Sequence, residues 1–445
     1  MKMARDGRLR TPHRRDWPGF LNRVVPASVW QAFWGIVAHE SDPRVRWSPK
    51  YVVLCWVAMG WSLQGQLTER CREGIELLKG LYPSRRRPGT SYQGLVKATE
   101  RLGDGVLQTF WRCLRGRIPR CLGQLWTWYG WIVMAVDGSR FQAARTRSNE
   151  RRLGRAGREK THPQWWVTCL IHVRTKLIWD WRQGPGTSSE RSHMVEMLAD
   201  LPACTLLVAD IGFGGFDFLR TLSRAGVHFL IRCASNTTLL VEETRQKIER
   251  VGEHRYVYLW PTGRRGQTPL RLRLIVLKRQ GRRVYLLTNV MESQRLSRSI
   301  ASEFYNARWG IEVGYRSLKQ TLGRRKVLAK SPGVGGRELA GNILALALLM
   351  LQGAVALRAR VAKLSVAALL RLIQRSIEAV RCCLRSGPFV AFFRTVARDE
   401  YVRRSSKRAR DWPHKKNESP PKPPKLRKPK RAEKARILQL SGGFG

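Results

Sequence analysis

Between Trp131 and Cys233 the sequence alternates short apolar runs with amphipathic segments in one particular order. Three strand-like runs come first, followed by a helix, a strand, a second helix and a last strand. This order predicts an α/β fold in which a mixed sheet carries helices on both faces. The expected strands are 131–136, 164–174, 176–181, 205–209 and 227–233, and the expected helices are 190–201 and 216–225.

The residues from Tyr305 to Lys319 contain polar side chains at helical spacing. Tyr305, Arg308, Glu312 and Lys319 follow the pattern Tyr-x2-Arg-x3-Glu-x6-Lys, and at about 100° per residue they fall within an arc of about 60°. One interpretation is a carboxylate among phosphate-binding groups, and the other is a solvated helix face with salt bridges. The apolar flank of this helix, which we expect to be buried, comprises Phe304, Ile311, Tyr315, Leu318 and Leu322.

Two aspartates are expected where short apolar strands end. Asp137 follows the first strand in Val-Asp-Gly-Ser, and Asp210 follows the fourth in Ala-Asp-Ile-Gly-Phe. Ligand sites of open sheets lie at strand ends. Glu312 follows later in the sequence, on the expected helix. Each acid has an ordinary structural role alone, such as the turn that Asp-Gly favours. The three together indicate metal-assisted chemistry on a phosphodiester.

With these motifs the sequence resembles the DDE transposases with an RNase H-like core, in the group of the insertion-sequence-four and transposon-five enzymes. The resemblance rests on residues 136–139 and 209–213, on Tyr-Leu-Leu-Thr-Asn at 285–289, and on the Tyr-Arg-Glu-Lys stripe. It implies a transposase of a bacterial insertion sequence that binds terminal inverted repeats. The implied reaction is metal-dependent DNA cleavage and strand transfer, in cut-and-paste transposition.

The same resemblance implies the cofactor and the partners. Asp137, Asp210 and Glu312 would be the catalytic, metal-binding triad, with two Mg²⁺ ions at the scissile phosphate and Mn²⁺ as a substitute. The implied partner is double-stranded DNA, both transposon ends and target. A homodimer is expected in the DNA-bound synaptic complex.

Further positions of the stripe are implied to contact DNA. Tyr305, Arg308 and Lys319 would bind phosphates near the cut, and for Trp309 both stacking on a displaced base and a place in the core are open. The second aspartate motif departs from the family, because relatives commonly have Asp-Arg-Gly-Phe and this chain has Ile211 instead of the arginine. Two alternatives stay open: an RNase H-like nuclease without strand transfer, which would use the same carboxylates, and an inactive DNA-binding remnant.

The charge of the chain independently indicates a polyanionic partner. Its formal net charge is +51, from 83 basic and 32 acidic side chains, and nucleic acid is the commonest partner of so basic a protein. Only 15 of the basic residues lie in the stretch 403–436, so most of the excess belongs to the body of the chain. The basic segment 143–162 beside Asp137 is either a DNA clamp or a plain surface loop.

Cysteine spacing and hydropathy indicate the cellular compartment in which the protein is expected. The nine cysteines include no Cys-x2-Cys pair, which argues against a zinc ribbon and a disulfide framework. The basic start has no apolar stretch behind it, so no signal peptide is expected. The longest apolar run, 343–357, is shorter than a membrane span and predicts a buried helix. A bacterial cytoplasmic protein near the nucleoid, without membrane contact, is expected.

We expect five parts of the chain. Residues 1–125 form a helical N-terminal region that either binds DNA ends or only packs. The two parts of the catalytic core, 126–233 and 291–400, are separated by a β-rich, antiparallel insertion at 234–290, where leucines alternate with arginines. Six prolines and many Lys and Arg residues predict a disordered tail at 401–445.

Overall fold

The computed structural model describes most of the 445-residue chain. The described residues are 22, 24–37, 45–82, 88–155, 162–242, 254–279, 282–357, 361, 364–381 and 422–441.

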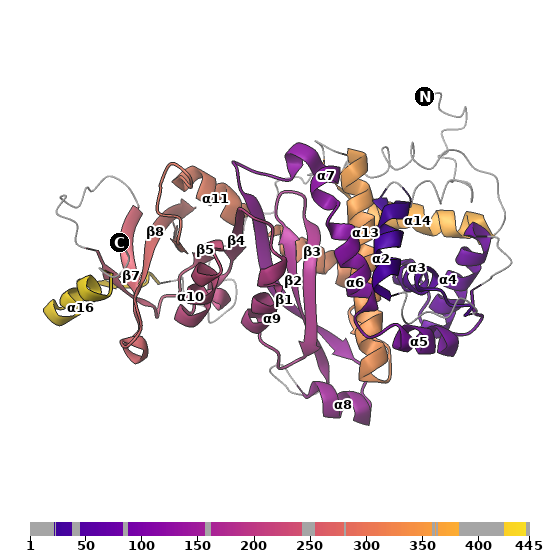
Figure 1. The fold of residues 1–445 in the computed structure, drawn as a ribbon. Helices are drawn as coiled ribbons and strands as arrows, with labels where there is room; N and C mark the ends of the chain where they lie inside the picture. Colours follow the sequence, from indigo (N-terminus) through magenta and orange to yellow (C-terminus); the bar gives the residue numbers. More distant parts are fainter. Residues whose placement is uncertain are drawn as a thin grey trace.

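One mixed sheet of eleven strands organises the described part of the chain, with the order β11-β6-β7-β8-β9-β5-β4-β1-β2-β3 and β10 beside β1 (Figure 1). β1, β2 and β3 pair antiparallel, whereas β1, β4 and β5 run parallel. The order β3-β2-β1-β4-β5 is the one expected of an RNase H-like core, so the predicted fold class is confirmed. The core strands are β1 (Ile132–Ala143), β2 (Gln164–His172), β3 (Leu177–Pro185), β4 (Thr205–Ala209), β5 (His228–Arg232) and β10 (Lys326–Val327).

The insertion is antiparallel, as predicted, and it extends the core sheet. β9 pairs with β5, so one continuous set of backbone hydrogen bonds joins the two parts. This pairing satisfies the polar backbone groups at the edge of the core. The insertion strands are β6 (Thr238–Val241), β7 (His254–Leu259), β8 (Leu270–Arg279) and β9 (Arg282–Thr288).

The helices of the core follow from hydrophobic patterning. In α10 the residues Phe216, Phe218, Leu219 and Leu222 are buried on one side of the helix, as a period of 3.6 residues requires. β4 is buried along its whole length, which suits a central parallel strand. The core helices are α8 (Arg147–Leu153), α9 (Glu190–Met197), α10 (Phe216–Arg224), α11 (Arg298–Ala307), α12 (Gly310–Arg316), α13 (Pro332–Leu357) and α14 (Val366–Arg381).

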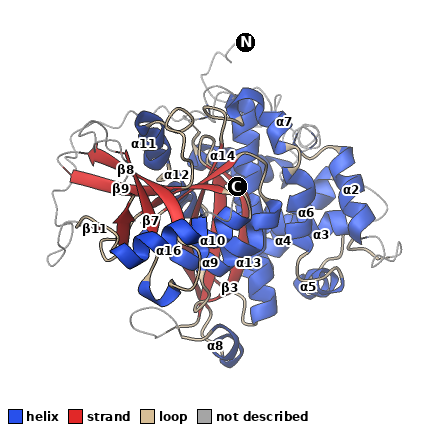
Figure 2. Cartoon of the chain, turned by 60° about the vertical axis from the view of Figure 1, so that its left-hand side comes forward, coloured by secondary structure: helices blue, strands red, loops and turns tan. Residues whose placement is uncertain are grey.

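The N-terminal region is helical, as predicted, and its helices gather at one side of the strands (Figure 2). α13 runs between these helices and the sheet, in contact with α3, α6 and β3 (Figure 1). By length and composition α13 could span a membrane, but 89% of its most apolar window is buried inside the protein, so the prediction of a buried helix is confirmed. The N-terminal helices are α2 (Ala27–Val37), α3 (Pro49–Trp61), α4 (Leu67–Leu81), α5 (Tyr92–Arg101), α6 (Val106–Arg115) and α7 (Ile118–Leu122).

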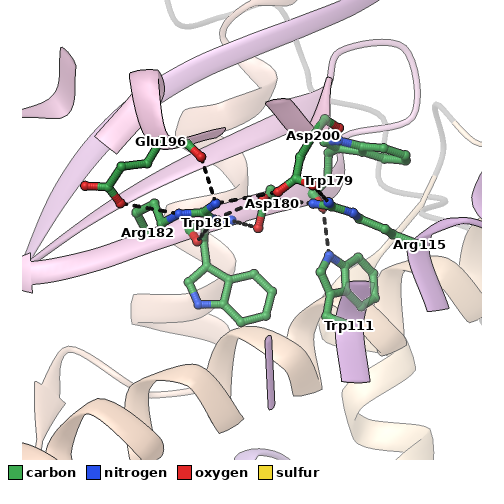
Figure 3. A network of polar contacts seen from close by, with 8 residues as sticks. All are labelled: Trp111, Arg115, Trp179, Asp180, Trp181, Arg182, Glu196 and Asp200. Atoms are coloured by element: carbon green, nitrogen blue, oxygen red, sulfur yellow. Dashed lines mark hydrogen bonds and ion pairs between the residues drawn. The ribbon is translucent and has the colours of Figure 1, made fainter. Parts of the chain in front are cut away.

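A buried ionic network joins α6 to the edge strand β3 (Figure 3). The Asp180 carboxylate, on β3, lies 2.8 Å from Arg115 Nη1 and 3.0 Å from Arg182 Nη1. Arg115 also reaches Asp200 at 2.7 Å. Only 2% of the Asp180 side chain is exposed. Because water does not screen this site, the network contributes to the attachment of the N-terminal helices.

A second buried acid holds α13 to the end of β10. Glu338 is 2% exposed, and its Oε2 accepts hydrogen bonds of 2.9 Å from the N–H groups of Leu328 and Ala329. Burial raises the pKa of Glu338 to about 7, although those N–H groups and the guanidinium of Arg70 oppose the shift. The folded protein therefore binds this proton more tightly than the unfolded chain does.

The raised pKa of Glu338 predicts that stability falls as pH rises from the ordinary carboxyl value of 4.5 to about 7. Glu338→Gln cannot ionise, so we expect the decline over this window to shrink by up to about 3 kcal/mol. Urea unfolding of both proteins at pH 5 and pH 8 measures the difference. Equal declines in the two proteins would contradict the prediction.

Two expectations need correction. The predicted first strand ends at Val136, but β1 continues to Ala143 because its polar half still pairs with β2. The predicted disorder of 401–445 is wrong for residues 422–441, where β11 (Lys425–Arg427) pairs with β6 and α16 (Arg431–Ser441) follows. Ile437 of α16 packs into a small cluster with Leu240, Tyr258 and Trp260. Residues 401–421 and 442–445 lie outside the described part.

Candidate active site

Asp137 and Asp210 lie at the same level on neighbouring strands. Ala135 of β1 pairs with Val208 of β4 in parallel register, and each aspartate comes two residues later. Beyond these pairs β1 stays with β2, and the chain after β4 turns into the short 3₁₀ segment η4 (Ile211–Phe213). The strands therefore part where the two carboxylates stand, which is the kind of crevice in which open sheets bind ligands.

The helix that bears Glu312 is interrupted, contrary to the expectation of one regular helix. α11 ends at Ala307 and α12 begins at Gly310, although Arg308 and Trp309 between them keep right-handed helical dihedral angles. A π-helical turn, η6 (Ser317–Thr321), follows α12. Gly310 lies at this interruption, and glycine destabilises a regular helix. The apolar flank is buried as predicted: Phe304, Ile311, Tyr315, Leu318 and Leu322.

Arg308 connects two of the predicted catalytic acids. Its Nη2 lies 3.8 Å from Asp210 Oδ2 and 4.0 Å from Glu312 Oε1, and the residue is only 5% exposed. Tyr305 Oη donates to Asp210 Oδ1 at 3.4 Å, and Arg232 Nη1 lies 3.9 Å from the same oxygen. The helix segment thus places a phenol and a guanidinium against the carboxylate that follows β4.

The third acid shares this electrostatic environment. Burial raises the pKa of Asp137, with a further increase from the Asp210 carboxylate, against the lowering effects of the Gly138 N–H and of Arg308. Burial likewise raises the pKa of Glu312, and the carboxylates of Asp137 and Asp210 add to the increase. Like charges close together have this effect. The three acids of the predicted triad therefore act on one another across a common space.

The donor atoms of this space suit a hard divalent cation. Carboxylate oxygens are the ligands that Mg²⁺ prefers, and Asp137, Asp210 and Glu312 are the residues that could hold it. Within the described residues, no three Asp, Glu, His or Cys side chains enclose a metal ion as they stand. Arg308, between Asp210 and Glu312, supplies a positive charge there instead.

Tyr315 is a residue whose importance the sequence did not reveal beyond its apolar spacing. Its hydroxyl, shared between two acceptors, lies 2.8 Å from the carbonyl oxygen of Asp137 and 3.0 Å from that of Val167. The same hydroxyl accepts a 3.0 Å hydrogen bond from the N–H of Cys169. These contacts hold α12, and with it Glu312, against β1 and β2.

A fourth carboxylate, Glu190, also faces the two strands, and the sequence indicated only that it begins a helix. Burial, followed by the charges of Asp137 and Asp210, raises the pKa of Glu190 to about 7, whereas Arg140 and Arg191 oppose this increase. The sequence does not predict that Glu190 lies near Asp137 and Asp210, because Glu190 follows a different strand, β3.

The remaining predicted positions lie around the acids. Lys319 Nζ donates to Ser139 Oγ at 2.7 Å, so it reaches β1 just beyond Asp137, and burial lowers its pKa. Trp309 is 54% exposed, which excludes the core role for this side chain. Ile211 is 42% exposed. Its side chain is uncharged, so the positive charges near Asp210 come from Arg308 and Arg232.

The chain is similar to several known proteins. Residues 129–348 match the family described as the transposase DDE domain. The chain carries a transposase DDE domain. Over 310 residues it is 25% identical to the transposase InsG for insertion sequence element IS4 of Escherichia coli (strain K12), covering 66% of this chain and 67% of the relative. A cryo-EM structure of the piggyBac transposase synaptic complex with hairpin DNA aligns with a TM-score of 0.41 at 13% identity, covering 90% of each chain.

The DDE domain defines the class of chemistry. It is a domain of DNA transposition that performs phosphoryl transfer on DNA and depends on divalent metal ions. The predicted family and enzyme class are thereby confirmed. The individual residues of the site remain predictions, which the geometry above supports.

Proposed function

We propose that this DDE transposase serves a bacterial insertion sequence, binds the terminal inverted repeats of its element and moves it by cut-and-paste cleavage and strand transfer. The observation that carries the proposal is the position of Arg308 between Asp210 and Glu312, together with the parallel register that puts Asp137 level with Asp210. Two Mg²⁺ ions, or Mn²⁺ in their place, would be held by these acids and would supply activation of the attacking hydroxyl and stabilisation of the departing oxygen.

In this proposal the basic and aromatic residues orient the DNA. Arg308, which lies between Asp210 and Glu312, would bind a phosphate of the DNA as a bidentate donor. Tyr305 and Lys319 flank the same space from opposite ends of the helix segment. Trp309, exposed at the break between α11 and α12, offers a stacking surface for a base.

A second basic surface supports the binding of a longer DNA segment. Arg147, Arg151 and Arg152 of α8 are exposed and line a hollow together with the N-terminal end of α13. Ala143, where β1 ends before α8, is six residues beyond Asp137, which corresponds to about 20 Å of extended chain. We assign this surface to the phosphate backbone of the transposon end or of the target.

The remaining elements of the proposal concern assembly and location. The protein would act as a homodimer that holds two transposon ends, in the bacterial cytoplasm at the nucleoid, without membrane contact. The net charge of +51 supports a DNA-bound location, because the polyanion neutralises the self-repulsion of the chain.

A strand-transfer assay tests the proposal. The full chain is incubated with Mg²⁺, a supercoiled plasmid and a pre-cleaved duplex that carries the element's terminal repeat with a free 3′-hydroxyl. We expect covalent joining of the duplex to the plasmid, and no joining when the repeat is scrambled. Cleavage of an uncut end without joining would favour the nuclease, and end binding without either reaction would favour the inactive remnant.

A further inference from the structure

Glu190 stands at the start of α9, directly after the loop that follows β3. Ser189 caps the helix by accepting a hydrogen bond from the N–H of Ser192, so the position of Glu190 is set by the first turn of α9. Its side chain points back to the parting strands that bear Asp137 and Asp210.

Two glycines define where the Glu190 carboxylate lies. A Cβ atom built on Gly138 would be 2.7 Å from both Cγ and Oε1 of Glu190, and one built on Gly212 would be 4.0 Å from its Oε2. Gly138 directly follows Asp137, and Gly212 comes two residues after Asp210. The carboxylate therefore lies between β1 at Gly138 and the chain that follows β4, and the missing side chain at position 138 provides its space.

The arginines near Glu190 are engaged with other groups. Arg140 stacks on the ring of Trp166, with its guanidinium carbon 4.4 Å from the ring centroid, and Arg191 Nε donates to the carbonyl of Gly212 at 2.8 Å. Among the described residues, no side chain forms an ion pair or hydrogen bond with the Glu190 carboxylate. A carboxylate directed at two others without a paired cation is unfavourable unless a cation joins them.

We propose that Glu190 is a fourth acidic ligand of the catalytic metal ions. It approaches from the α9 side of the parting strands, whereas Glu312 approaches from α12. This inference rests on the proposed function of the acidic triad, and it adds a ligand that the three-acid pattern of a DDE domain does not contain. An added carboxylate ligand raises the affinity for a hard cation.

Mn²⁺ binding to the full chain without DNA, measured by isothermal titration calorimetry, tests the assignment. Glu190→Gln keeps the size of the side chain but removes its charge, and we expect about 10-fold weaker binding or more. The matched control is Glu196→Gln on the same helix, whose side chain is 58% exposed and turned to Arg182; its Mn²⁺ affinity should equal that of the wild type. Glu190→Ala should reproduce the loss.

The proposal makes a second, independent measurement possible. Without metal, Glu190→Gln should melt at the same temperature as the wild type or higher, because a repelling charge is removed, and it should gain less from added Mn²⁺. Wild-type Mn²⁺ affinity in Glu190→Gln, together with weakened binding in Asp137→Asn, would overturn the fourth ligand alone. Wild-type affinity in both variants would overturn the metal centre of the proposed function as well.

Discussion

Glu312→Gln is expected to lower the rate of transposon-end cleavage by about 10³-fold or more, because several kcal/mol of transition-state stabilisation depend on the bound metal. The amide keeps the shape of the side chain but is a weaker ligand for a hard cation than a carboxylate. Arg308 would retain Asp210 as its acidic partner, so the local fold should persist. Single-turnover cleavage of a labelled end in Mg²⁺ measures the rate.

The matched control for this experiment is Glu303→Gln. Glu303 is exposed on the preceding helix α11 and accepts a hydrogen bond from Tyr129 Oη at 3.2 Å, away from the acids. We expect its cleavage rate to stay near that of the wild type. Asp137→Asn should match Glu312→Gln, and the double variant should be no worse than either, since the acids act as a unit. Near-wild-type cleavage by Glu312→Gln would exclude Glu312 from the reaction.

Asp180→Ala is expected to lower the free energy of unfolding by about 3–5 kcal/mol, because it removes the buried carboxylate that forms ion pairs with the buried Arg115 and the partly buried Arg182. Arg115 is 6% exposed, and both it and Arg182 point at the lost carboxylate (Figure 3). Urea denaturation followed by tryptophan fluorescence measures the change, and loosening of the N-terminal helices should accompany it.

The control lies in the same network. Glu196 contacts Arg182 at 3.5 Å from an exposed position, and a surface ion pair of this kind is worth about 0–1 kcal/mol. Glu196→Gln should therefore unfold almost like the wild type. If Asp180→Ala and Glu196→Gln have the same stability, the buried network does not hold α6 to β3.

The predicted strands and helices agree best with the structure where one segment carries its own hydrophobic pattern. β4 has the predicted limits, and α10 differs by one residue. β1 was predicted too short because its second half is polar, and only pairing with β2 keeps it extended. The ordered segment 422–441 was missed for a similar reason: its prolines and basic residues predict disorder, but β6 and a small apolar cluster provide partners for it.

The features of the candidate site also fall into those that local sequence patterns predict and those that depend on the tertiary structure. The helical stripe and the two Asp motifs were readable in the sequence, because helical periodicity and the ends of apolar runs are local properties. Strand pairing and helix packing determine three other features: the register of Asp137 with Asp210, the hydrogen bonds of the Tyr315 hydroxyl and the position of Glu190. Local patterns do not encode these distances.

By itself, the sequence determined the order of strands and helices, the class of the domain and the three acids of the expected triad. The tertiary structure alone decided that Arg308 lies between Asp210 and Glu312, and that a fourth carboxylate shares the space. The physical reason is that charges interact according to their separation in space. That separation arises only when residues from β1, β4, α9 and α12 meet in the folded chain.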